Sequence, residues 1–277
     1  MRKLLCANFY CLRRNKILWA ELGCTAILSV LIVATNYSPE IQATESRLSL
    51  DDVFFTLYQF LGIILAAGIS LIVGTEYSDG TIRNKLVAGN TRTQVYFANL
   101  IASTVPSCLV LLVHGILTYG LGRFLFGSFQ IPAEQVLTAF SCACLTAFVF
   151  SALFAAVAMN CSNKAATAVA SLLLALGLLF LASAIGNILT EPEMTYNGVT
   201  ISMDGVQFGD WIQNPAYVSG FQRTLYEFVY DLLPTGQLLQ MYCLDFTRSA
   251  RWPVLSAVLI VLVTAAGFLA FRRKDLK

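Results

Sequence analysis

Six long apolar segments dominate this sequence, and five of them contain no charged residue. A helix needs about 20 apolar residues to cross the hydrocarbon core of a bilayer, and each segment approaches or exceeds that length. Only the first segment carries a charge, at Glu21. The pattern therefore predicts an all-α integral membrane protein with six transmembrane helices. The segments are Ile17–Ala34, Val53–Gly74, Val95–Gly122, Val136–Met159, Ala165–Gly186 and Val254–Phe271.

The composition excludes the main alternatives to a membrane protein. Of 277 residues, 57% are apolar and 12% are charged, which is too few charges for the surface of a soluble fold and too many apolar residues for a disordered chain. A net charge of +2 without a long basic face argues against nucleic-acid binding. The eight cysteines do not form a disulfide framework. Cys142 and Cys144 would point about 200° apart on a helix, which favours packing over metal binding.

The basic residues predict the orientation of the chain. If both termini are cytoplasmic, 13 of the 18 Lys and Arg residues lie on the inner side, as the positive-inside rule requires. The first apolar run is too long for a signal peptide and lacks a small-residue cleavage site. We therefore expect a multi-pass protein with an uncleaved first span.

Small residues recur every four positions on two predicted helices. The second span carries Gly62, Ala66, Ser70 and Gly74, and the fourth carries a similar run from Ala139 to Ala155. Such stripes let helix backbones approach closely in a membrane. They indicate packing within one chain, or alternatively a face toward a second copy or a transport path.

Two polar side chains within the spans call for an explanation. We expect Glu21, about one turn into the first span, to reach the interface or to pair with a nearby Arg or Lys; proton coupling is the alternative. His114 is the only histidine. It cannot form a metal site alone, so a hydrogen-bonded packing role is predicted.

The loop between the second and third spans predicts a short amphipathic helix. Ser78 or Asp79 could cap its start and Gly89 could end it. Its apolar side would carry Ile82, Leu86 and Val87, with Arg83 and Lys85 elsewhere. This pattern is typical of a docking element at the inner membrane face, and equally of a plain juxtamembrane loop.

This loop resembles that of the ABC type-2 permeases, the membrane subunits of bacterial ATP-binding-cassette exporters. The family pattern has a Glu before a Gly-Thr pair, then an apolar residue, a Leu and a downstream Arg. This chain departs from it in one respect, since its Glu stands four residues before the Gly rather than three. The corresponding residues are Glu76, Gly80, Thr81, Ile82, Leu86 and Arg92.

The resemblance extends over the full length and implies a single permease domain, residues 1–277. An N-terminal amphipathic elbow helix would occupy residues 1–16, with an apolar stripe of Met1, Leu5, Phe9 and Leu12. A cytoplasmic coupling helix would lie in the loop 75–90. Short outer-leaflet helices would precede the last span, with a stripe from Phe221 to Leu232 and a break at Pro234. The extracytoplasmic segment 187–252 is longer than in a minimal family member.

The resemblance also implies a half-transporter in the bacterial plasma membrane. Two permease chains, identical or paralogous, would bind two copies of a separate ATPase that holds ATP and Mg. This chain would bind no cofactor and would not be an enzyme. Arg83 and Lys85 would dock on the ATPase, Glu76 would hold the loop, and Tyr58 and Gln59 would line the path.

Several kinds of cargo and several roles are compatible with the sequence. Apolar second and fifth spans favour hydrophobic or amphipathic cargo, such as a peptide antibiotic, a drug or a lipid. The alternatives are an ATPase-linked sensor or immunity module, an independent ion-coupled carrier or channel, and an intramembrane enzyme. The chain lacks a phosphate-binding loop of its own, as well as the H-E-x-x-H and G-x-S-x-G motifs.

Overall fold

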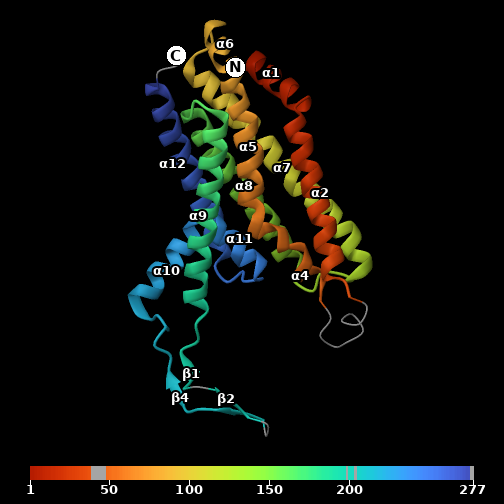
Figure 1. Cartoon of the computed structure of the whole chain (residues 1–277), viewed down its shortest axis with the longest axis vertical. Coiled ribbons are helices and arrows are strands. Elements are labelled where there is room, and N and C mark those ends of the chain that lie inside the picture. Colours follow the sequence, from red (N-terminus) through yellow and green to blue (C-terminus); the bar gives the residue numbers. More distant parts are fainter. Residues whose placement is uncertain (39–47, 198, 203–204, 275–277) are drawn as a thin grey trace.

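Six apolar helices, each long enough to cross a membrane, form the body of the computed structural model, which describes residues 1–38, 48–197, 199–202 and 205–274 (Figure 1). Each contains one of the predicted apolar segments, so the number and order of the spans are confirmed for the described residues. The candidate spans are Lys16–Asn36, Leu50–Ser78, Arg92–Leu125, Ala133–Asn160, Lys164–Thr190 and Ser249–Arg273.

Shorter helices and four strands accompany the spans. The helices are α1 (Arg2–Arg13), α2 (Lys16–Asn36), α4 (Leu50–Phe54), η1 (Thr56–Phe60), α5 (Leu61–Ser78), α6 (Thr81–Val87), α7 (Arg92–Leu125), α8 (Ala133–Asn160), α9 (Lys164–Thr190), α10 (Gly220–Leu232), α11 (Pro234–Tyr242), η2 (Ser249–Arg251) and α12 (Trp252–Arg273). The strands are β1 (Met194–Tyr196), β2 (Val199–Ser202), β3 (Gly205–Phe208) and β4 (Trp211–Gln213).

Local capping residues set several helix starts. Thr91 and Gln94 form a reciprocal capping box at the start of α7, which satisfies backbone N–H groups that have no partner within the helix. Ser49 and Asp52 do the same for α4. Pro253 occupies the first turn of α12, where its missing N–H costs no hydrogen bond.

The second span differs from the continuous helix expected over Val53–Gly74. It begins as the short helix α4, tightens into the 3₁₀ helix η1, and becomes a regular α-helix at Leu61. Phe54, Phe55 and Tyr58 are almost completely buried at this break. Phe55 packs edge-to-face against both Phe54 and Tyr58, so the aromatic packing accompanies a backbone irregularity that the apolar run did not reveal.

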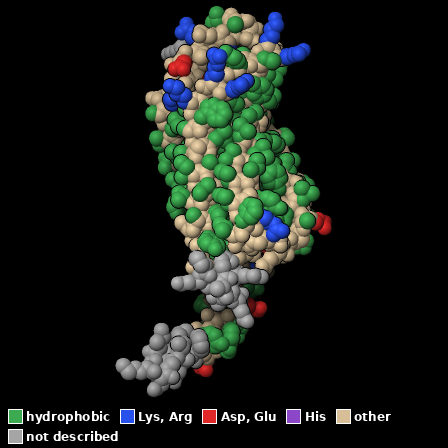
Figure 2. All heavy atoms as spheres, turned by 90° about the vertical axis from the view of Figure 1, so that its right-hand side faces the viewer, with side chains coloured by type: hydrophobic (Ala, Val, Ile, Leu, Met, Phe, Trp, Pro, Cys, Tyr) green, Lys and Arg blue, Asp and Glu red, His purple; other side chains and the backbone are tan. Residues whose placement is uncertain are grey.

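The two ends of the bundle differ in charge and in shape. Helices α1 and α6 and the end of α12 lie together at what we call the terminal end, whereas the strands project from the opposite, hairpin end (Figure 1). Figure 2 shows Lys and Arg side chains gathered at the terminal end, above a broad apolar band. This distribution agrees with the orientation that the positive-inside rule predicts.

Helices α5 and α8 form the centre of the bundle. Helix α5 contacts both α8 and α9, and α12 packs along α8. In the most apolar 18-residue stretch of α8, 67% of the residues are buried, compared with only 22% in α9 and 17% in the last span, which contains α12. The last two spans therefore present wide apolar faces outward, as membrane-facing or subunit-facing helices do.

The segment 187–252 combines the predicted helices with strands that the sequence did not indicate. Strand β1 pairs with β4 and β2 with β3, both antiparallel, as two two-stranded sheets. Helix α10 exposes Phe221, Leu225 and Phe228 on one side, and the chain breaks before α11 at Pro234. The amphipathic stripe and the break therefore lie where the sequence placed them.

Candidate functional site

Helix α6 is a short helix of seven residues at the terminal end, between the end of α5 and the start of α7 (Figure 1). Helix α5 continues through Ser78, so neither Ser78 nor Asp79 caps α6 as expected. Gly80 occupies the N-cap position with φ +66°, a left-handed conformation that glycine adopts without a steric cost. Gly89, also left-handed, follows the helix, as predicted.

Glu76 stands at the centre of a polar cluster that joins four helices. Its Oε2 accepts hydrogen bonds from Lys85 Nζ on α6 and from Asn99 Nδ2 on α7, each at 2.7 Å. Asn99 Oδ1 accepts in turn from Asn8 Nδ2 on α1 at 2.8 Å and from Lys85 Nζ at 3.1 Å. We call Asn8, Glu76, Lys85 and Asn99 the Glu76 cluster.

The Glu76 cluster is largely removed from water. The side chains of Lys85 and Glu76 are 15% and 23% exposed, and Asn8 and Asn99 are buried. A charged pair in this setting is screened less than a surface pair, so the loss of one member costs more. The cluster lines a cavity of about 240 Å³ between α1, α5 and α7. The cluster links α6 directly to α5 and α7 and, through Asn99, to α1.

The two faces of α6 differ sharply. Ile82 is 1% exposed and packs into the main core, and Leu86 is half-buried. Arg83 and Val87 are exposed, Val87 at 81%, and they are four residues apart on the same side of the helix. The expectation that Val87 shares the apolar side with Ile82 is therefore wrong. Since Lys85 is held by Glu76, Arg83 is the exposed cation of α6.

Thr81 and Arg92 stabilise the chain around α6. Thr81 Oγ1 donates to the carbonyl oxygen of Glu76 at 2.8 Å and so closes the turn before the helix. Arg92 Nη1 donates to the carbonyl oxygens of Arg272 at 2.8 Å and Lys274 at 2.6 Å. Arg92 thus caps the end of α12, where a cation interacts favourably with the helix dipole.

Lys274 completes the contacts at this end. Its Nζ donates to the carbonyl oxygen of Cys161 at 2.9 Å and lies 4.2 Å from the centre of the Tyr77 ring. Burial lowers the pKa of the Lys274 ammonium, because the charged form loses hydration. The start of α7, the end of α8 and the end of α12 are tied together here.

The small-residue stripe of α5 lies inside the chain. Gly62, Ala66, Ser70 and Gly74 are all buried. A Cβ added to Gly62 would lie 2.9 Å from the Phe150 ring of α8, and one added to Gly74 would lie 3.3 Å from the backbone of Lys164 on α9. The stripe thus allows close packing of α5 against α8 and α9.

The polar residues singled out in the spans are placed as follows. His114 Nε2 donates to the carbonyl oxygen of Phe54, and its Nδ1 lies 2.9 Å from Ser29 Oγ; a hydrogen-bonded packing role is confirmed. Tyr58 is 2% exposed and packs against the rings of Phe54, Phe55 and His114. Gln59 is half-buried and donates to the carbonyl oxygen of Thr56.

The expectation for Glu21 is wrong. Its side chain neither reaches the interface nor pairs with a basic residue, and neither carboxylate oxygen has a hydrogen-bond partner among the described residues. It packs against Gly68, where an added Cβ would lie 2.1 Å from the carboxylate. Glu21 faces α5, and the lack of a side chain at Gly68 leaves room for it there.

Sequence reasoning missed two members of the Glu76 cluster, Asn8 and Asn99. Asn8 lies between Leu4 and Leu12 on the buried face of α1. This face shares Leu12 with the predicted stripe, whereas Met1 and Phe9 of that stripe are exposed. Asn99 is an amide within the long apolar run of the third span. A polar residue in such a position is costly unless it is paired. The presence of Asn99 in an apolar run was therefore a signal that it has a polar partner.

Comparison with known protein families matches residues 4–200 to a family described as "ABC-2 family transporter protein". A comparison with curated proteins gave no match. The match covers more than half of the chain and includes most of α1, the first five spans and α6. The chain therefore belongs to the ABC-2 transporter family and is a permease subunit of an ABC transporter, a membrane component that works with an ABC ATPase subunit.

Proposed function

We propose that this chain is half of an ATP-driven exporter, and that α6 transmits the movement of a separate ATPase to the spans. The supporting observation is the contrast between the two sides of α6. One side is fixed to α1, α5 and α7 through the Glu76 cluster, and the other presents Arg83 and Val87 outward. A rigidly held helix with an exposed apolar and cationic face suits docking into a protein groove.

In this mechanism, ATP and Mg bind to the ATPase and not to this chain. Closure of two ATPase subunits displaces α6, and the Glu76 cluster passes the displacement to α1, α5 and α7 together. Two permease chains, identical or paralogous, enclose the path, and the two end states differ in their affinity for cargo. The terminal end faces the cytoplasm of a bacterial cell.

The proposed cargo is hydrophobic or amphipathic. Helices α9 and α12 present apolar side chains outward over most of their length, including Leu173, Phe180 and Val261. A path formed against such faces would offer few partners to a hydrated ion. A peptide antibiotic, a drug or a lipid meets this condition.

The decisive variant is Arg83→Glu in the assembled transporter. Reversal of an exposed interface charge leaves the fold intact and places like charges together in the complex. We expect roughly tenfold weaker ATPase binding, with loss of stimulated ATP hydrolysis and of export from vesicles. Val87→Asp should act in the same direction.

Lys3→Glu is the matched control, since Lys3 is an exposed cation on α1 at the same end. It should leave binding and export near wild-type values. Normal ATPase stimulation and export by Arg83→Glu would overturn the docking proposal. Purification of the chain from its native membrane without any ATPase, even after crosslinking, would argue for an independent carrier or channel.

A further inference from the structure

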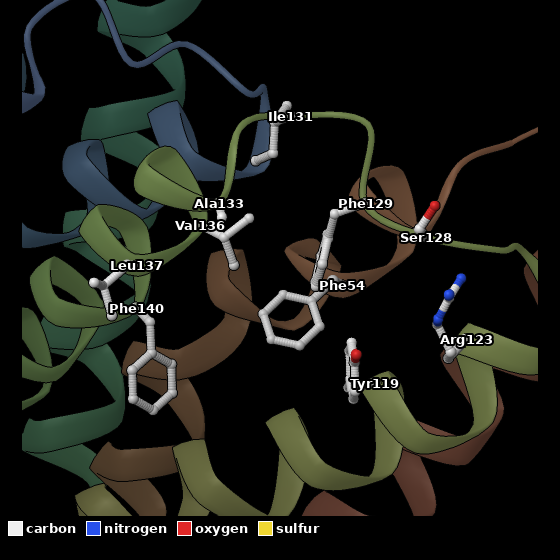
Figure 3. Close-up of a pocket in the computed structure, with 10 residues that line it drawn as sticks. All are labelled: Phe54, Tyr119, Arg123, Ser128, Phe129, Ile131, Ala133, Val136, Leu137 and Phe140. Carbon is white, nitrogen blue, oxygen red and sulfur yellow. The ribbon is translucent and has the colours of Figure 1, made fainter.

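A cavity of about 520 Å³ opens between α4, α7 and α8 at the hairpin end (Figure 3). Aromatic side chains form its wall. The rings of Tyr119 and Phe129 are stacked with centres 5.9 Å apart, and Phe54 meets Phe129 edge-on at 5.3 Å. Phe140 closes the side formed by α8 (Figure 3). These rings give the cavity a rigid, apolar interior.

A second cavity, of about 270 Å³, adjoins the first and extends it along α7 to Leu112. The two share Phe54, Tyr119, Phe129 and Phe140, and we call them together the aromatic groove. Leu112 lies 11 residues before Arg123, which corresponds to about 16 Å along the helix. Leu112 and Ile116 are 47% and 68% exposed, so the groove opens sideways within the apolar band of the span.

Arg123 is the cation at the mouth of the aromatic groove (Figure 3). Its side chain is exposed, and within the described part of the chain it makes no ion pair or hydrogen bond. It lies two residues before Leu125, where α7 ends, and a cation at the end of a span is expected near the membrane–water interface. The carboxylate of the neighbouring Asp51 is buried and accepts from the backbone N–H of Gln130.

We propose that the aromatic groove binds an anionic phospholipid from the leaflet at the hairpin end. One acyl chain lies along the aromatic rings toward Leu112, and the phosphate accepts hydrogen bonds from the Arg123 guanidinium. The arrangement combines the two features of an anionic lipid: an apolar chain that avoids water and a phosphate that pairs well with arginine. This site is distinct from α6 and does not depend on the proposed exporter mechanism.

The test uses the purified full chain and native mass spectrometry with added phosphatidylglycerol or phosphatidylcholine. Wild type should retain phosphatidylglycerol more tightly than phosphatidylcholine. Arg123→Gln should lower the affinity for phosphatidylglycerol roughly tenfold, because a charge-assisted contact is lost, and should leave phosphatidylcholine binding unchanged. Leu137→Trp, at an exposed position that lines the groove, should weaken binding of both lipids.

Lys16→Gln is the control, because Lys16 is an exposed cation at the start of a span at the opposite end. It should retain wild-type lipid binding. Equal phosphatidylglycerol affinity in wild type and Arg123→Gln would overturn the proposal, as would an unchanged affinity of both lipids for Leu137→Trp. Competition by glycerol phosphate alone would indicate a free-anion site instead. Formation of a chain dimer that Leu137→Trp abolishes would assign the groove to a second copy.

Discussion

The substitution Glu76→Gln tests the Glu76 cluster most directly. Glutamine has nearly the same size and still offers an oxygen to Asn99, so the change removes little besides the negative charge opposite Lys85. The Lys85 ammonium, 15% exposed, then loses its counter-charge without gaining access to water. We expect the anchor of α6 to weaken while the helices themselves remain folded.

The expected cost follows from the degree of burial. Exposed ion pairs contribute about 0.2–1 kcal/mol, and removal of one partner from a fully buried pair costs about 3–5 kcal/mol. The Lys85–Glu76 pair lies between these limits at 15% and 23% exposure, so Glu76→Gln should cost about 2 kcal/mol. With an unfolding entropy of about 2.1 cal/mol/K per residue, this loss lowers the Tm of a 277-residue chain by roughly 3–4 °C.

Thermal unfolding of the purified chain in lipid nanodiscs measures this effect, and a double-mutant cycle with Lys85→Met isolates the pair. The two substitutions should be non-additive by about 1 kcal/mol or more, because each removes the same interaction. Arg83→Gln, on the exposed face of the same helix, should change stability by less than about 0.5 kcal/mol. Additive effects of the two cluster substitutions would refute the coupling between them.

The same unfolding assay checks three further predictions. Gly236→Ala should cost about 3 kcal/mol or more, because its Cβ would lie 2.1 Å from the backbone oxygen of Tyr230; an unchanged Tm would contradict this packing. Gly68→Ala should cost about 1–3 kcal/mol, and Glu21→Ala in the same chain should restore most of the loss, whereas equal loss in the double variant would place the clash elsewhere. His114→Phe should cost about 1–3 kcal/mol by leaving its buried hydrogen-bond partners unsatisfied, and wild-type stability would show that these bonds are dispensable.

The spans could be predicted from sequence because their signal is long and local. An apolar run such as Ala165–Gly186 has no other stable environment than a membrane or a buried core. Caps such as Thr91–Gln94 were equally readable, since both partners lie within four residues. The break in the second span was not, because it accompanies packing between Phe54 and residues 60 or more positions away, His114 and Phe129.

The candidate site was predictable only in part, for the same physical reason. The position of α6 and its bounding glycines follow from local residue preferences. That Lys85 is held in the Glu76 cluster while Arg83 is exposed could not be predicted in this way. It depends on Asn99, 14 residues from Lys85, and on Asn8, 91 residues from Asn99. For Glu21 the prediction was wrong for a different reason. Charged residues in membranes are usually paired, but the residue that faces Glu21 is Gly68, which has no side chain to pair with it.

Helix α7 connects the two ends of the molecule as one element of 34 residues, about 51 Å long. Asn99 fixes it near the terminal end, and His114 and Arg123 lie toward the hairpin end. Between them, Pro106 lies within the continuous helix, and a proline removes one backbone hydrogen bond and weakens the helix locally. If α6 is displaced as proposed, we therefore expect α7 to bend near Pro106: the segment before Pro106 would move, while the hydrogen bonds of His114 with Phe54 and Ser29 would hold the segment after it.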